Sequence, residues 1–420
     1  MSTALKRPYL VFLPFAVATF VFQLLSVLRY ASGISGADGQ WYWNETELFL
    51  DSNGLFDERQ FSRSYQYPGF IAFAGGLRGL LSADSPGYIY VTNAVLLVGL
   101  GFLSLAVGKW AFNDFVGIVA GVLVMWVPSI AWAVPTIGYE VLFVFLVMSS
   151  LAAYVAAAQR RDYKSTATWA LLIASCLLLF AAYFTVSKAI VILPILVILI
   201  WQRFGRGHAL TYAGLFVIGL LLLGLRNLVT HGVFFFTSLN TGATLWLSNN
   251  PEAKGLYMDP PWIPGVGLDN NVVQIHPSFG VPVNLYNDLF TSAAVNWIIR
   301  NPADFINLLW LKLGYTWGPP TLAASSSPAQ VPEWLYPLIS IGHYLVIVLA
   351  VIAAVIWAWS RPKIWRAPAL VFWSGLVLIV ATMPFHGSPR YQSAFMPMVL
   401  LFAVAGAQVI WLRVRGRLDR

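Results

Sequence analysis

The sequence has few charged residues and almost no cysteine. Of its 420 residues, 10% are Asp, Glu, Lys or Arg and 59% are hydrophobic, and the mean hydropathy is +0.72. Because soluble domains are about a quarter charged, this composition excludes a soluble protein and indicates a polytopic membrane protein. The single cysteine, Cys176, excludes both an intrachain disulfide framework and a thiolate metal cluster.

Histidine clusters, internal repeats and charges within the apolar segments are also lacking. The five His residues are dispersed, without the spacing of metal ligands. No repeat with a period of about 20 to 50 residues is visible, which disfavours a solenoid or propeller. Transporters and channels place ionisable groups within their spans and often carry inverted repeats. Their absence here favours chemistry at one membrane face over passage through the membrane.

Long hydrophobic runs are what the sequence has in abundance. Windows of about 20 apolar residues predict ten transmembrane helices. They lie at about residues 9–28, 88–108, 114–134, 138–158, 167–184, 188–202, 209–228, 336–359, 367–384 and 391–412. A further apolar stretch, at about 68–81, is expected to graze the membrane interface. The fold class predicted is therefore an all-α polytopic membrane protein.

The basic residues predict the orientation in the membrane. With the N-terminus inside, the cytoplasmic segments carry 15 of the 25 basic residues but only three of the 17 acidic ones. We therefore expect both termini in the cytoplasm and a first helix that is retained, since no cleavage site for a signal peptide is obvious. The net charge of +8 is spread over short membrane loops, which excludes nucleic acid as a partner.

Two longer segments lie outside under this topology. The first covers about residues 29–87, within an N-terminal module of residues 1–228. The second covers about 229–335, and residues 336–420 then form the C-terminal transmembrane helices. Interfacial or surface helices are predicted in these loops at about 41–50, 285–300 and 302–317.

Two carboxylates are placed where helices meet the outer face. Asp38 follows the first span by about ten residues, where a carboxylate is easily hydrated and can still reach a lipid head group. This position suits chemistry on a membrane-borne substrate, or else Asp38 is an N-cap for the helix expected to begin near Trp41. Glu140 begins the fourth span, where an acid either stabilises the helix N-terminus or assists catalysis.

Several cations suit a phosphate group. Arg390, with His386 nearby, lies in an outward turn where a guanidinium binds phosphate in a bidentate manner or anchors the chain at the interface. Lys188 lies between the fifth and sixth spans, where it contacts a phosphate or extends its amine to the surface. Arg226 ends the seventh span.

Amides and aromatic rings suit a sugar. Asn249 and Asn250 offer amide groups to sugar hydroxyls, although turn formation explains an Asn-Asn-Pro sequence equally well. Aromatic rings stack on sugar faces or belong to the interfacial belt of a membrane protein. The aromatic candidates are Trp41, Tyr42 and Tyr67.

Four stretches, in order along the chain, carry a resemblance to a known family. They are Ala37–Tyr42 with Tyr65–Gly69 downstream, Gly138–Phe143, the run from Leu225 to Gly255 with its Arg-Asn pair and Asn-Asn-Pro segment, and Pro389–Tyr391. Together they resemble the integral membrane glycosyltransferases of the GT-C fold, specifically bacterial relatives of the dolichyl-phosphate-mannose protein mannosyltransferases. One departure is Ser187-Lys188-Ala189, where the family has an Arg-Pro-Glu-like segment.

The resemblance implies a hexosyl- or pentosyltransferase that uses a polyprenyl-phosphate-linked sugar at the outer face of a bacterial inner membrane. Its acceptor would be a lipid-linked glycan, an envelope polysaccharide or a protein, and the reaction would invert the anomeric carbon. Asp38 would act as base, with Glu140 also catalytic. Arg390, Lys188, His386 and Arg226 would bind the donor phosphate, which as a leaving group needs charge stabilisation more than a general acid.

Alternatives remain open at this point. One is a polysaccharide polymerase or ligase that uses diphosphate-linked donors, and another is a membrane transporter or flippase. No cofactor is required by the sequence. A divalent cation, Mg²⁺ or Mn²⁺, held by Asp38 and Glu140 is compatible with it.

Overall fold

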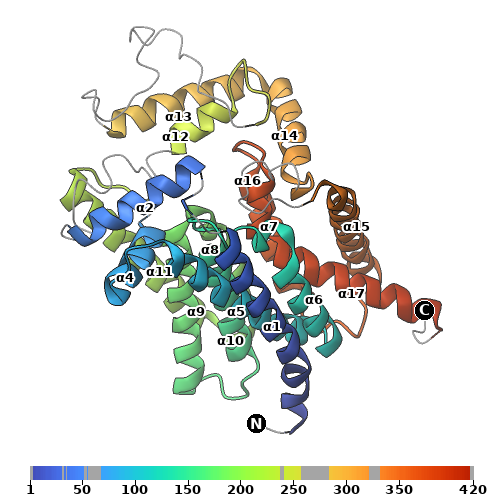
Figure 1. Cartoon of the computed structure of the whole chain (residues 1–420). Helices are drawn as coiled ribbons and strands as arrows, with labels where there is room; N and C mark the ends of the chain where they lie inside the picture. Colours follow the sequence, from blue (N-terminus) through green and yellow to red (C-terminus); the bar gives the residue numbers. More distant parts are fainter. Residues whose placement is uncertain are drawn as a thin grey trace.

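The protein is described by a computed structural model that covers residues 3–30, 33–34, 36–51, 54, 68–236, 241–256, 283–320 and 332–416. Within these ranges the regular structure is helical, with no strand. Tyr67 lies outside the described residues. Figure 1 shows a bundle of long helices with a group of shorter helices over one end.

Within the described residues, eight helical segments are long and apolar enough to cross a bilayer. They are α1 (Thr3–Tyr30), α5 (Gly87–Ala111), α8 (Glu140–Ala158), α9 (Thr166–Thr185), η2 (Ser187–Ile192) with α10 (Leu193–Phe204), α11 (Arg206–His231), η5 (Glu333–Leu335) with α15 (Tyr336–Ser360), and α17 (Met396–Val414). Each coincides with a predicted span. The prediction of an all-α integral membrane protein is confirmed.

The other two predicted spans are shorter than expected. The helix α6 (Asp114–Trp126) was expected to reach residue 134 but has only 13 residues. It ends where it does because Pro128 restricts the preceding residue, and Val127 is extended with ψ of 125°. The short α7 (Pro128–Ala131) follows, so the second half of this prediction is wrong. The helix α16 (Pro368–Thr382) has 15 residues.

Two further predicted boundaries change. The last span begins at Met396, because the 3₁₀ helix η6 (Pro389–Ala394) precedes α17. The apolar stretch expected at the interface forms α4 (Gly69–Leu81), a helix of 13 residues. These changes leave the order of the elements as predicted.

Four helices lie at the end of the bundle opposite the N-terminus. They are α2 (Gly36–Asp51), α12 (Thr241–Ser248), α13 (Val283–Arg300) and α14 (Pro302–Thr316), and Figure 1 shows the last three above the bundle. The two predicted surface helices are confirmed as α13 and α14. The helix expected to begin at Trp41 begins at Gly36 instead. Asp38 is therefore in the first turn of α2, and its interpretation as an N-cap is wrong.

One continuous core joins the N-terminal and C-terminal helices. Glycines allow α5 and α6 to pack closely, since a Cβ on Gly117 would lie 2.6 Å from the carbonyl oxygen of Leu105. Leu401 of α17 packs against Gly108 of α5. A separate small cluster holds α12 on α13 through Ala243, Trp246, Phe290 and Ala294. The helices α12 and α13 thus share a small core of their own.

Candidate active site

Arg390 joins two carboxylates from distant parts of the sequence. Its Nη1 lies 2.7 Å from Oδ2 of Asp38 in the first turn of α2. Its Nε donates to Oε1 of Glu140, the first residue of α8. The structure therefore brings three of the predicted site residues together, from α2, α8 and η6. We call Asp38, Glu140 and Arg390 the charged cluster.

The members of the charged cluster differ in exposure. The side chain of Asp38 is 64% exposed and that of Arg390 40%, whereas that of Glu140 is 7% exposed. Glu140 raises the pKa of Arg390 further above its usual value, and Asp38 acts in the same direction. The guanidinium is therefore permanently charged. A molecule that arrives from outside meets Asp38 and Arg390, with Glu140 beneath them.

A small cavity lies beside the charged cluster. Its volume is about 20 Å³, roughly the space of one water molecule. The lining includes Tyr139, Glu140, Lys188, Arg390 and Tyr391, together with Thr382 at the end of α16. A sugar phosphate is far larger than this cavity. Side chains of the cluster must therefore separate before such a ligand can bind here.

A second cation, Lys188, lines the same cavity. The Lys188 Nζ is 3.7 Å from the centre of the Tyr391 ring. The hydroxyl of Tyr391 is 2.9 Å from Nε2 of His386. Burial lowers the pKa of His386 to about 4, and the charges of Lys188, Arg390 and Lys312 lower it as well. His386 is therefore neutral at pH 7 and contributes a hydrogen bond without a charge.

Two of the predicted aromatic residues, Trp41 and Tyr42, lie on α2 just after Asp38. Tyr42 is buried, with its ring centre 5.0 Å from that of Phe70 and 6.2 Å from that of Tyr139. Trp41 is half-buried and packs edge-on against Tyr42 at 4.7 Å. Tyr42 thus packs as a core residue. Trp41 keeps part of its surface available for a ligand.

Asn249 and Asn250 are both fully buried and bonded within the protein. The Asn250 amide donates to the carbonyls of Trp246 and Leu247 and accepts from the backbone N–H of Glu252. Asn249 donates to the carbonyls of Leu245 and Pro384. These bonds favour the turn-forming interpretation of the pair. A role in sugar binding stays a prediction.

Lys312 of α14 completes a second polar group of residues. It is 1% exposed, and its Nζ lies 2.6 Å from Oδ1 of Asn249 and 3.2 Å from the carbonyl oxygen of Pro384. Burial lowers the pKa of Lys312 to about 8, so it is still charged at pH 7. We call Lys312, Asn249 and the Pro384 carbonyl the buried clamp.

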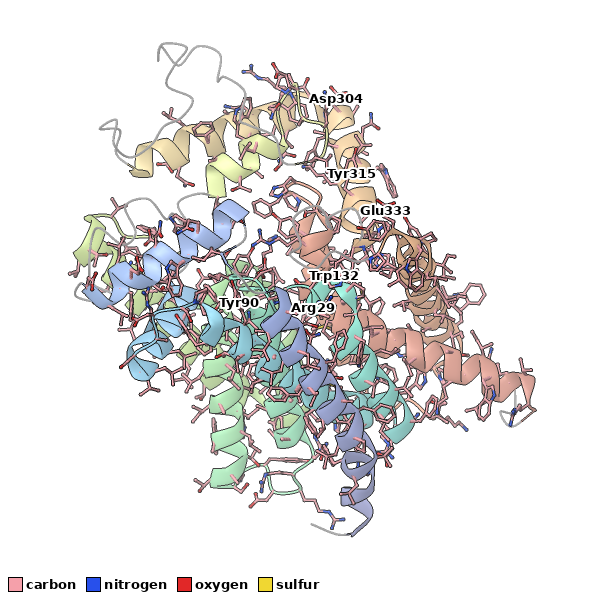
Figure 2. The ribbon with its side chains drawn as sticks, in the orientation of Figure 1. Arg29, Tyr90, Trp132, Asp304, Tyr315 and Glu333 are labelled. Atoms are coloured by element: carbon pink, nitrogen blue, oxygen red, sulfur yellow. The ribbon has the colours of Figure 1, made fainter. Side chains whose placement is uncertain are left out.

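The buried clamp holds the segment that leads to Arg390. The N–H of Gly387 donates to the Gly255 carbonyl at 2.7 Å. A Cβ on Gly387 would lie 2.6 Å from the carbonyl oxygen of Lys312 and 2.8 Å from the Cβ of Tyr315. Figure 2 labels Tyr315 at the lower end of α14. The helices above the bundle are thus fixed to residues 384–387, just before the charged cluster.

Arg226 lies at the end of α11. Its Nη1 donates to the neighbouring Asn227 at 2.7 Å, and Asn227 donates to the carbonyl of Phe235 at 2.6 Å. These contacts tie the last turns of α11, where Arg226 lies, to the segment that follows the helix. Its role in phosphate binding stays a prediction.

Sequence reasoning missed Lys312 and Tyr139. Lys312 reads as an ordinary lysine of an amphipathic surface helix, and no sequence signal marks it as buried. Tyr139 borders Glu140, and the Arg390 guanidinium lies 5.5 Å from the centre of its ring. Its place beside an acid at a span boundary is the signal that could have identified it.

Comparisons with known proteins identify the fold. Neither a family model nor a curated protein sequence matches the chain. The apo oligosaccharyltransferase of Archaeoglobus fulgidus matches in structure with a TM-score of 0.53 at 11% identity, over 96% of this chain and 52% of that one. The chain thus spans about half the length of that enzyme. We conclude that the chain has the GT-C fold, as predicted.

Two further structures match with lower scores. The oligosaccharyltransferase AglB of the same organism, in complex with an inhibitory peptide and a dolichol-phosphate, has a TM-score of 0.49 at 10% identity, over 96% of this chain and 52% of that one. ArnT from Cupriavidus metallidurans in the apo state has a TM-score of 0.40 at 13% identity, over 96% of this chain and 77% of that one.

Proposed function

We propose that this protein is a glycosyltransferase that transfers a sugar from a polyprenyl-phosphate-linked donor. The observation that carries the proposal is the charged cluster. On a GT-C fold, one arginine stands between an exposed and a buried carboxylate, and Lys188 lines the same small cavity. A cationic pair beside an accessible carboxylate is the minimum that this reaction needs, because it stabilises the leaving phosphate and accepts the acceptor's proton.

Arg390 and Lys188 are the groups that we assign to the donor phosphate. In the structure Arg390 bonds both carboxylates, so a phosphate would replace Asp38 as its partner. Asp38 gives up its bond to Arg390 at low cost, because its side chain is mostly exposed to water. Glu140 is buried and stays bonded to the guanidinium, which it orients.

Asp38 then acts as the base. As the acceptor oxygen forms its bond to the anomeric carbon, the hydroxyl proton passes to a carboxylate oxygen of Asp38. The bond between the anomeric carbon and the phosphate oxygen breaks, and its electron pair remains on the phosphate, facing Arg390. Without a covalent sugar intermediate this displacement inverts the anomeric carbon.

We propose that the charged cluster works without a divalent cation. Asp38 and Glu140 are the carboxylates that would hold Mg²⁺ or Mn²⁺, but Arg390 already bonds an oxygen of each. Within the described residues no group of three His, Cys, Asp or Glu side chains could complete such a site. We infer that the guanidinium supplies the positive charge at this place.

The ends of the helices support a proposal for the membrane side. The charged cluster lies at the first residue of α8, whereas the basic residues that follow α8 lie at its other end. We therefore assign the reaction to the extracytoplasmic face of a bacterial inner membrane, with both termini in the cytoplasm. The sugar is a hexose or a pentose, and the acceptor is a lipid-linked glycan, an envelope polysaccharide or a protein.

The donor can be identified and the base tested in one system. Lipid extracted from the purified protein is first analysed by mass spectrometry for a sugar on a polyprenyl carrier. Proteoliposomes are then supplied in parallel with monophosphate-linked and diphosphate-linked forms of this donor. We expect release of the monophosphate carrier. Use of the diphosphate form alone would instead indicate a polymerase or ligase, and uptake without transfer would indicate a transporter.

Asp38→Asn is the decisive variant. It should lower the transfer rate at least about 10²-fold, because the amide cannot accept the proton. Asp51→Asn is the matched control, since Asp51 is an exposed carboxylate at the other end of α2. The melting temperature of both variants should stay near that of the wild type. Undiminished transfer by Asp38→Asn would refute the assignment of the base.

A further inference from the structure

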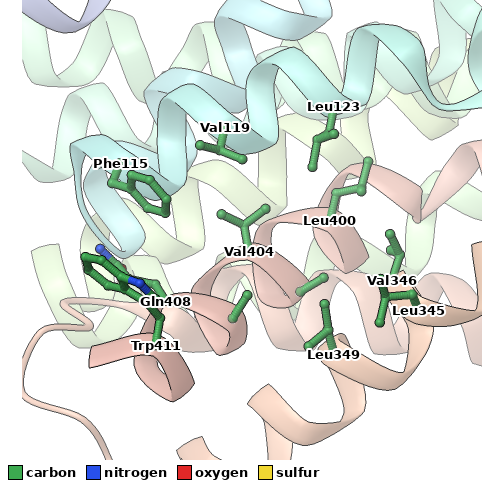
Figure 3. Close-up of a pocket in the computed structure, with 12 residues that line it drawn as sticks. Phe115, Val119, Leu123, Leu345, Val346, Leu349, Leu400, Val404, Gln408 and Trp411 are labelled. Carbon is green, nitrogen blue, oxygen red and sulfur yellow. The ribbon is translucent and has the colours of Figure 1, made fainter. Parts of the chain in front are cut away.

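A groove lies along α17, and none of the residues that line it lines the small cavity beside the charged cluster. It is formed by α6, α15 and α17 and has a volume of about 550 Å³. Figure 3 shows apolar side chains from all three helices along it, among them Val119, Leu349 and Val404. Its size is that of a site for an extended hydrophobic chain.

The groove has no polar group to offer along its length. Gln408 is the one amide in its lining, and its Oε1 accepts from Nδ2 of Asn113 at 2.8 Å. Asn113 also caps α6 through the N–H of Val116. The amide is thus engaged at the end of α6. The occupant of the groove must be apolar over this length.

The length of the groove matches one leaflet of a membrane. On α17 the lining runs from Leu400 to Trp411, about eleven residues, which is about 16 Å of helix. The hydrocarbon core of a bilayer is about 30 Å thick, so a leaflet contributes about half of this. Phe115 and Trp411 mark the end of the groove, at the membrane face that carries the basic residues.

Cations surround this end of the groove. The Arg415 guanidinium lies 4.5 Å from the centre of the Trp411 ring, and Arg413 donates to Ser360 at the end of α15. Lys109 pairs with Asp114, the residue before Phe115, at 3.4 Å. Arg361, Lys363 and Arg366 are exposed in the loop that follows α15. Among the described residues, the rim thus carries these six cations against one acid, Asp114.

We propose that this groove binds an anionic phospholipid of the leaflet on the basic face. One acyl chain lies along α17 between α6 and α15, and the phosphate lies at Arg413 and Arg415. The proposal does not depend on the reaction proposed above, because the groove shares no lining residue with the small cavity and its cationic rim lies at the end of α17 away from η6 and Arg390. The length of the apolar lining fits one acyl chain of the lipid, and the cations at the rim favour an anionic head group.

Native mass spectrometry of the detergent-purified full chain tests the proposal. The protein is titrated with palmitoyl-oleoyl phosphatidylglycerol and, separately, with the matching phosphatidylcholine. We expect the wild type to retain phosphatidylglycerol preferentially. The variant R413Q/R415Q should lose at least about fivefold in that retention, given the contribution of a single cation near a membrane surface.

The controls separate this site from general surface charge. R160Q/R161Q removes two exposed arginines in the loop after α8 and should keep the wild-type retention. Ala407→Trp fills the groove and should lower the retention of both lipids, whereas Leu222→Trp, at an exposed position of α11, should not.

Three results would overturn the proposal. They are equal retention of the two lipids by the wild type, an equal loss in R160Q/R161Q, and displacement of phosphatidylglycerol by a polyprenyl phosphate. The last would make the groove a carrier site. Transfer by Asp38→Asn bears on none of these results, so the two proposals fail separately.

Discussion

The charged cluster and the buried clamp are two polar networks that lie near each other and differ in almost every physical respect. The charged cluster has two carboxylates on one cation, and two of its three side chains are substantially exposed. The buried clamp has one cation on two neutral oxygens, and Asn249 and Lys312 are 0% and 1% exposed. A polar group that reaches water can change partners at low cost, whereas a buried one cannot.

Under the proposed function, the charged cluster carries out the chemistry and the buried clamp supports its structure. The charged cluster can open to admit a phosphate, because water replaces any bond that Asp38 gives up. The buried clamp must keep its bonds, and through them it holds residues 384–387 beside α14. We therefore expect variants of the charged cluster to lower the rate and variants of the clamp to lower the stability. Each prediction below challenges this division.

The largest effect is expected for Arg390→Ala. The transfer rate should fall about 10³-fold, because the leaving phosphate loses its principal cation. Arg390→Lys should recover only part of the rate, since an ammonium cannot bond both Glu140 and a phosphate in the same fixed geometry. The measurement is single-turnover release of the carrier phosphate. A rate loss below tenfold in Arg390→Ala would place the phosphate elsewhere.

Lys312→Met should chiefly affect stability. The variant leaves Oδ1 of Asn249 buried without its donor, at a cost of about 1 to 3 kcal/mol. We expect a clear fall in melting temperature and a rate per folded molecule within tenfold of the wild type. Lys254→Met, an exposed lysine on the nearby turn, is the matched control. A stable but inactive Lys312→Met would show that the clamp takes part in the chemistry.

His386 should make stability depend on pH. Its pKa of about 4 in the folded protein lies below the usual 6.5, so the unfolded chain binds more protons between these values. The contribution of His386 to the free energy of unfolding is therefore fully present above pH 6.5 and is lost as the pH falls toward 4. Between pH 7 and pH 5 this loss is about 2 kcal/mol.

Thermal unfolding in detergent at pH 7 and pH 5 measures this effect. His386→Gln should reduce the difference between the two pH values. His208→Gln, at the opposite face, should keep it. An unchanged difference in His386→Gln would assign the effect to other groups.

The smallest effect is expected on removal of divalent cations. Because Arg390 bonds both carboxylates, treatment with EDTA should change the transfer rate less than about twofold. Added Mg²⁺ or Mn²⁺ should likewise have little effect. A rate abolished by EDTA and restored by Mg²⁺ would show that a cation displaces Arg390 during the reaction.

The fold could largely be predicted from the sequence. Hydrophobic runs define spans because the bilayer imposes their length, and this holds for α5, α11 and α15. It fails for α6, where Pro128 ends the helix while the apolar sequence continues. The start of α2 was also missed, because Gly36 and Ala37 carry no hydrophobic pattern that would extend the helix toward Asp38.

The site was predictable only in part. Asp38, Glu140 and Arg390 follow span boundaries and the family resemblance, which identify residues at the same membrane face. Burial could not be predicted, since it depends on the packing of segments far apart in the sequence. The full burial of Asn249 and the role of Lys312 both arise from the contact of α14 with residues 384–387.

The short helix α16 has a consequence for the depth of the reaction in the membrane. It runs from Pro368, beside the basic face, to Thr382 in the lining of the small cavity. Its 15 residues extend about 23 Å, roughly 7 Å less than the hydrocarbon thickness of a bilayer. The cavity is therefore recessed below the lipid head groups, or the bilayer is thinner around it. A carrier phosphate would reach Arg390 without its isoprenoid chain leaving the membrane, and the acceptor would have to descend to meet it.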